Sequence, residues 1–82
     1  MPDPRLTILV VEDEAAIAET ITYALQTEGF APVWKSTGRE ALAVLAAQAV
    51  ALVVLDVGLP DMSGFDVCRE LRKRQAVPVI FL

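Results

Sequence analysis

Acidic side chains follow two apolar stretches of this chain, in an arrangement that could hold a cation. Glu12, Asp13 and Glu14 come directly after residues 6–11, and Asp56 comes directly after residues 51–55. Two carboxylates about 4 Å apart repel each other by roughly 4 kcal/mol at an effective dielectric near 20. A cluster of such groups therefore binds a cation, takes up protons or has a basic partner.

The residue types available narrow the chemistry of such a cluster. The chain contains no histidine, which removes the usual transition-metal ligand and the usual general base. Ligation by oxygen alone favours Mg²⁺ or a similar hard ion. Such an ion suits phosphoryl groups because it neutralises charge on the attacking and transferred oxygens. A carboxylate can also be the nucleophile itself and form an aspartyl phosphate.

Apolar stretches indicate the strands that must position these acids. They predict β-strands over residues 6–11, 31–35, 51–56 and 77–82. The third stretch shows no alternation of polar and apolar residues, which is typical of a strand buried on both faces of a parallel sheet. Pro32 places the second strand at an edge, where no ladder donor is missed. Ligands of open parallel sheets lie just outside the carboxyl ends of the strands, where Asp56 stands.

Helical spacing and capping residues predict a helix between each pair of strands. Gly29 is well placed as the left-handed residue that ends the first helix. Thr37 with Glu40, and Ser63 with Asp66, fit capping boxes that begin the second and third helices. The inward face of the third helix is expected to carry Phe65, Cys68 and Leu71.

The alternation of strands and helices predicts an α/β fold, a flavodoxin-like doubly wound parallel sheet. With the second strand at the edge, the strand order is 2-1-3-4. Right-handed crossovers place the first helix on one face and the other two helices on the opposite face. The crevice then lies between the first and third strands, and Glu12, Asp13 and Asp56 all open into it.

Two motifs resemble the receiver domain of two-component response regulators. They are E-D-E after the first strand and D-V-G-L-P-D-M-S-G-F-D after the third. The resemblance implies that Asp56 accepts a phosphoryl group from a sensor histidine kinase. It also implies a Mg²⁺ site formed by Glu12, Asp13, Asp56 and the backbone carbonyl of Gly58. Pro60 and Gly64 match the turn of that family.

The resemblance also sets expectations about what lies outside the chain. Receiver domains continue after the fourth strand with a Ser or Thr, a helix, a fifth strand ending in Lys, and a last helix. Residues 1–82 are therefore expected to be a receiver domain truncated at its C-terminus, lacking the fifth strand and the last two helices. A C-terminal DNA-binding domain would link it to transcription regulation. The fourth strand would become an exposed edge, from which we expect self-association.

Composition limits the remaining function classes. The net charge of −4 disfavours direct nucleic acid binding by this segment, because phosphate binding needs a basic face. The apolar stretches are too short to predict an export signal or a membrane span. One cysteine, Cys68, cannot form an internal disulfide, which fits a cytoplasmic protein.

Two rival functions remain. A haloacid-dehalogenase-like phosphatase also uses Mg²⁺ and an aspartate at a strand end, but it requires Asp-x-Asp. The chain has Asp13-Glu14-Ala15 and Asp56-Val57-Gly58, and neither fits. The second rival is an interaction fragment without phosphorylation chemistry. The acids favour a phosphoacceptor signalling domain that is not an enzyme.

Overall fold

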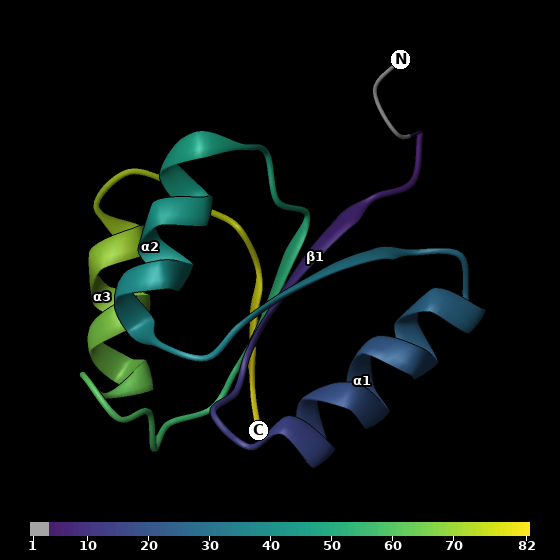
Figure 1. Cartoon of the computed structure of the whole chain (residues 1–82). Helices are drawn as coiled ribbons and strands as arrows, with labels where there is room; N and C mark the ends of the chain where they lie inside the picture. The colour runs from purple at the N-terminus through teal and green to yellow at the C-terminus, as the bar shows by residue number, and fades with distance from the viewer. Residues whose placement is uncertain (1–3) are drawn as a thin grey trace.

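Strands and helices alternate strictly along the chain in the computed structural model, which describes residues 4–82 (Figure 1). In chain order they are β1 (Thr7–Val11), α1 (Ala15–Thr27), β2 (Ala31–Lys35), α2 (Gly38–Ala47), β3 (Leu52–Leu55), α3 (Gly64–Arg72) and β4 (Val79–Phe81). The predicted second strand is confirmed residue for residue, and the other three are shorter than predicted at one or both ends. None of the helices within residues 4–82 has the length and apolar character needed to cross a membrane.

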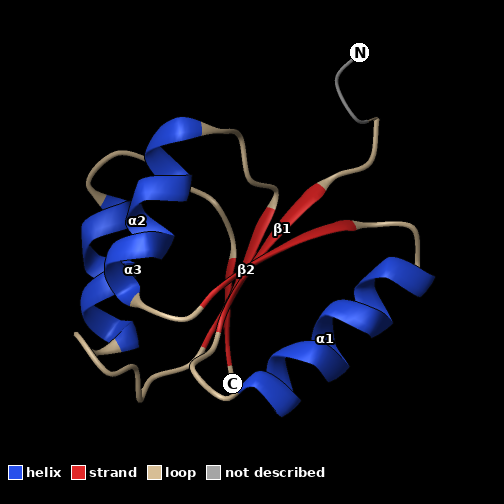
Figure 2. Ribbon diagram, in the orientation of Figure 1, coloured by secondary structure: helices blue, strands red, loops and turns tan. Residues whose placement is uncertain are grey.

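All four strands are parallel and lie in the order β2-β1-β3-β4, which confirms the predicted topology. Figure 2 shows the sheet nearly edge-on, with α2 and α3 on one side and α1 on the other, as predicted. The β1 strand pairs with both β2 and β3, so it occupies an inner position. This arrangement brings the carboxyl ends of β1 and β3 to the same edge.

Burial on both faces of the sheet explains why the central strands show no alternation. Leu9 and Leu55 are fully buried in the core that α2 and α3 cover. Val10 points to the opposite face and is equally inaccessible, and Val54 on that face is 8% exposed. Both sides of β1 and β3 therefore require apolar side chains.

The ends of α1 and α2 follow the predicted local chemistry in part. Gly29 has φ +87°, the left-handed conformation expected after the end of α1. Thr37 caps α2 by accepting a hydrogen bond from the Glu40 N–H at 3.2 Å. The Glu40 carboxylate accepts from the Thr37 hydroxyl rather than from the Thr37 amide. The predicted capping box is thus correct in its Thr37 half only.

The start of α3 differs more from the prediction. Ser63 accepts a hydrogen bond from the Phe65 N–H at 3.1 Å, so it is the N-cap as expected. The Asp66 carboxylate instead forms an ion pair with Arg69 at 2.8 Å. The predicted capping box between Ser63 and Asp66 is therefore wrong, because a cation one turn along the helix competes for the carboxylate.

The inward face of α3 is also rotated from the predicted one. Val67 and Leu71 are buried, and Cys68 is half-buried. Phe65 is 55% exposed, so the expectation that it points inward is wrong. Its ring instead lies against Phe81 of β4, with ring centroids 5.1 Å apart. Phe65 thus packs against the ring of Phe81 outside the core instead of being buried in it.

Candidate metal centre

The register of β1 against β3 brings the acidic residues to one place. Val11 is paired with Leu55, and the Asp56 N–H donates to the Val11 carbonyl at 2.9 Å. The residues that follow in each strand, Glu12 and Asp56, therefore leave the sheet side by side. Carboxylate oxygens of Glu12, Asp13 and Asp56 lie within 4.8 Å of one another. The structure thus groups the three acids that the sequence singled out.

The main chain of Glu12 is held by β2 on its other side. The Glu12 N–H donates to the Lys35 carbonyl at 3.1 Å, and the Trp34 indole Nε1–H donates to the Glu12 carbonyl at 2.7 Å. The Glu12 side-chain Oε1 accepts a hydrogen bond from the Glu14 N–H, two residues further along the chain, at 3.2 Å. With only 3% of its surface exposed, Glu12 is the buried member of the cluster.

The environment of Glu12 raises the pKa of its carboxyl group above the usual value. Burial is the largest cause, and the hydrogen bond from the Glu14 N–H partly opposes it. The negative charges of Asp56 and Asp13 raise it further. A bound cation would reverse these charge effects, because it favours the ionised form.

The donor set fits a hard divalent ion. Three carboxylates offer oxygen atoms only, which is the ligation that Mg²⁺ prefers. Within residues 4–82, ion pairs join Asp66 to Arg69 and Glu70 to Lys73, and neither pair involves one of the three clustered carboxylates. These ion pairs give the cluster no basic partner, and its oxygen donors are of the kind that a hard cation binds.

A tight loop after β3 sets the position of the Asp56 side chain. The Gly58 N–H donates to Asp56 Oδ1 at 3.3 Å, and Gly58 forms an isolated bridge with Ser63. The Gly64 N–H then donates to the Val57 carbonyl at 2.8 Å. A Cβ atom on Gly64 would collide with the Asp56 carbonyl oxygen. Glycine is required there because the two backbone segments touch.

Asp61 helps to hold the loop after β3 in place, a role that the sequence did not reveal. Its carboxylate oxygens accept from the Gly38 N–H at 2.8 Å and from the Arg39 N–H at 3.0 Å, at the start of α2. These two bonds, the Gly38 bond first, hold the pKa of Asp61 below its usual range. In the sequence, Asp61 follows Pro60 in a predicted turn. That signal does not identify Gly38 and Arg39 as its partners, because they lie 23 and 22 residues away.

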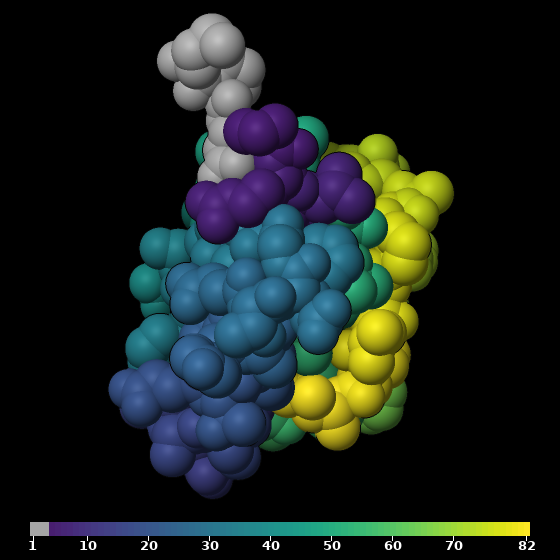
Figure 3. Space-filling view, turned by 90° about the vertical axis from the view of Figure 1, so that its right-hand side faces the viewer, coloured from purple at the N-terminus to yellow at the C-terminus, as the bar shows by residue number. Residues whose placement is uncertain are grey.

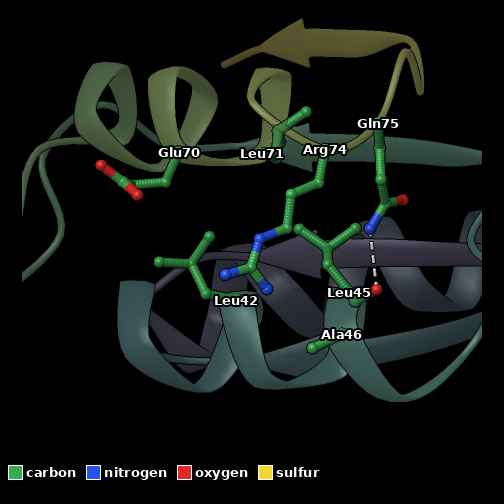
Figure 4. A pocket seen from close by; sticks show the side chains of 7 residues that line it. All are labelled: Leu42, Leu45, Ala46, Glu70, Leu71, Arg74 and Gln75. Atoms are coloured by element: carbon green, nitrogen blue, oxygen red, sulfur yellow. Dashed lines mark hydrogen bonds between the residues drawn. The ribbon is translucent and has the colours of Figure 1, made fainter.

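A hollow between α2 and α3 lies away from the clustered acids (Figure 4). Its volume is about 160 Å³, and it is lined by Leu42, Leu45, Ala46, Glu70, Leu71, Arg74 and Gln75. The Gln75 side chain crosses it to donate to the Leu45 carbonyl at 2.8 Å. None of the three clustered carboxylates contributes to its lining. It is therefore separate from the candidate metal centre.

Comparison with known proteins points to one family. The family model described as response regulator receiver domain matches residues 8–82. Transcriptional regulatory protein CreB of Escherichia coli is 47% identical over 79 residues, which cover 95% of this chain and 34% of that protein. The chain thus spans about a third of the length of the curated relatives it matches.

Solved structures give the same result. Response regulator protein TrrA of Thermotoga maritima, crystallised in complex with Mg²⁺-BeF, matches with a TM-score of 0.87 and 36% identity, covering 93% of this chain and 67% of that one. The same regulator in complex with histidine kinase ThkA also matches with a TM-score of 0.87 and 36% identity, over 93% of this chain and 66% of that one. The similarity thus extends to fold and sequence together.

Proposed function

The chain belongs to the response regulator receiver domain family, and from this we propose that it accepts a phosphoryl group on Asp56 from a sensor histidine kinase. The observation that carries the proposal is the convergence of Glu12, Asp13 and Asp56 at two neighbouring strand ends. Support comes also from the TrrA structures, whose titles report complexes with Mg²⁺-BeF and with a histidine kinase.

We assign Mg²⁺ to the clustered carboxylates. Asp13 and Asp56 would bind the ion, Glu12 would bind it directly or through water, and Gly58 would add its backbone carbonyl. Bound there, the ion would neutralise charge on the transferred oxygens. Burial and then the charges of Asp56 and Asp13 raise the pKa of Glu12, and a bound cation would offset the part that comes from those charges.

Asp56 has the exposure and contacts that a nucleophile needs. Its side chain is half-buried, so a donor can approach, and its Oδ1 accepts the Gly58 N–H. A carboxylate oxygen of Asp56 would attack phosphorus. The bond between phosphorus and the donor histidine nitrogen then breaks, and an acyl phosphate forms on Asp56.

We propose that the domain is a signalling module rather than an enzyme. The name of the relative transcriptional regulatory protein CreB supports a role in transcription regulation. We propose that phosphorylation acts there through a DNA-binding domain outside these residues, in the cytoplasm. A phosphatase of the haloacid-dehalogenase type is disfavoured because neither Asp13 nor Asp56 begins the Asp-x-Asp sequence.

Phosphorylation of the protein that carries this chain is expected to require Mg²⁺. With a small phosphoryl donor and Mg²⁺, mass spectrometry should show one added phosphoryl group, which hydroxylamine removes because it is an acyl phosphate. With a chelator in place of Mg²⁺ the modification should fall at least tenfold, on the order of one lost charge-stabilising interaction in the transition state. Equal modification in chelator, or a hydroxylamine-stable product, would contradict the proposal.

We also propose that the isolated chain associates with a second copy through β4. Within residues 4–82 the outer side of β4 has no neighbouring strand. The Val53 N–H donates to the Pro78 carbonyl and the Leu82 N–H to the Leu55 carbonyl, so alternate residues Val79 and Phe81 direct their main-chain groups away from β3. Figure 3 shows this segment, in yellow, open at the surface beside α1.

The two edges of the sheet differ in what protects them. On β2, Ala31 and Lys35 face β1, which leaves Pro32 facing outward without an N–H. No proline lies within β4, and its middle residue, Ile80, is 53% exposed. An open apolar edge of this kind pairs readily with another strand. We therefore expect pairing at β4 and not at β2.

Light scattering on the 82-residue chain is expected to show dimers whose fraction rises with concentration. Ile80→Lys should shift the chain to monomer, because two lysines would meet across the paired edges. Tyr23→Lys is the matched control, since Tyr23 is 70% exposed on α1, and it should leave dimers intact. A wild-type chain that stays monomeric at high concentration rejects this proposal.

A further inference from the structure

The single tryptophan of the chain reaches from β2 to the acidic turn after β1. Its indole Nε1–H donates to the Glu12 carbonyl at 2.7 Å, a short bond for an N–H donor. Trp34 is 39% exposed, so the ring is not a core residue. The indole N–H is thus directed at a main-chain group of the acidic turn.

The indole takes the place of a missing ladder donor. The β1–β2 ladder ends where the Glu12 N–H donates to the Lys35 carbonyl. One step further, the Glu12 carbonyl would accept from the amide of Thr37. Thr37 instead caps α2, and the chain turns away from the ladder at that point. Trp34 supplies the hydrogen bond that the turn removes.

Fixing this carbonyl also fixes the peptide plane between Glu12 and Asp13. That plane determines the direction in which the Asp13 backbone leaves β1, and therefore where its carboxylate points. We propose that Trp34 is a positioning residue that orders the acidic turn for cation binding. The inference rests on the proposed Mg²⁺ role of the cluster, and it assigns to Trp34 no contact with the ion.

Calorimetric titration with Mg²⁺ tests the proposal. Trp34→Phe keeps an aromatic ring but removes the N–H donor, and we expect the Mg²⁺ dissociation constant to rise about two- to tenfold, the range given by the net loss of one neutral hydrogen bond. Benzothienylalanine at position 34 keeps the size of the ring system and lacks the N–H, so it should match Trp34→Phe.

Val33→Ala is the matched control, because Val33 packs against the core from the same strand. It should lower the melting temperature without changing the Mg²⁺ dissociation constant, when both are measured well below that temperature. A second readout needs no metal. The Glu14 amide, which donates to Glu12 Oε1, should exchange its hydrogen faster in Trp34→Phe than in wild type or Val33→Ala.

The outcomes separate the two proposals. A dissociation constant within twofold of wild type in Trp34→Phe, or an equal rise in Val33→Ala, overturns the role of Trp34 and leaves the metal site standing. A wild-type chain that binds no Mg²⁺ overturns the metal site, and the positioning role falls with it.

Discussion

Replacing Asp56 with asparagine is expected to abolish phosphoryl incorporation while leaving the fold intact. An amide is not a nucleophile, so no acyl phosphate can form at that position. Asparagine has the same shape, and its Oδ1 can still accept the Gly58 N–H that Asp56 Oδ1 accepts at 3.3 Å. Modification measured by mass spectrometry should fall to the background of the assay.

Stability should not fall with it. The charge of Asp56 contributes to the raised pKa of Glu12, so removing that charge relieves repulsion in the metal-free protein. The melting temperature without Mg²⁺ is therefore expected to stay level or rise. Asp66→Asn is the matched control, since Asp66 is paired with Arg69 on the surface of α3, and it should be modified like wild type. Phosphoryl incorporation that survives in Asp56→Asn would refute the assignment of the acceptor.

Gly64→Ala is expected to cause a large loss of stability and to weaken Mg²⁺ binding. The new Cβ would collide with the Asp56 carbonyl oxygen and would lie 2.9 Å from the Val57 Cα atom. Both neighbours are backbone atoms, so neither can move aside without shifting Asp56. Overpacking of this kind costs about 1–3 kcal/mol in the free energy of unfolding.

Denaturant unfolding and calorimetric Mg²⁺ titration measure the two effects. Gly58→Ala is the matched control in the same loop, because a Cβ atom at Gly58 meets nothing within 4 Å. We expect Gly58→Ala to lie close to wild type in denaturant unfolding, because the added Cβ atom meets no other atom. Equal stability of the two alanine variants would show that the close approach of α3 to Asp56 is not a constraint.

The acids and their strands could be predicted from the sequence because the signals are local. Residues 51–55 are apolar without alternation, which indicates a strand buried on both faces, and Asp56 ends that stretch. Pro32 marked the edge strand, and with that edge fixed, the order of the sheet followed. Neighbouring strand ends then placed Asp13 beside Asp56, and the structure groups them.

What could not be predicted depends on contacts between segments far apart in the chain. The bonds of Asp61 to Gly38 and Arg39, and of Trp34 to Glu12, join residues with no local pattern between them. Phe65 was assigned to the core by helical spacing, but the ring of Phe81 gives it an outward contact. Spacing predicts which residues share a face, and tertiary contacts decide how that face is turned.

The two hydrogen bonds of Asp61 have a mechanical consequence. They join the loop that follows Asp56 to the first turn of α2, the helix that connects β2 to β3. A modification of Asp56 that displaces this loop must either break both hydrogen bonds of Asp61 or move the first turn of α2 with the loop. A displacement of the loop at the end of β3 would thus move the start of α2 at the molecular surface, where another protein could bind.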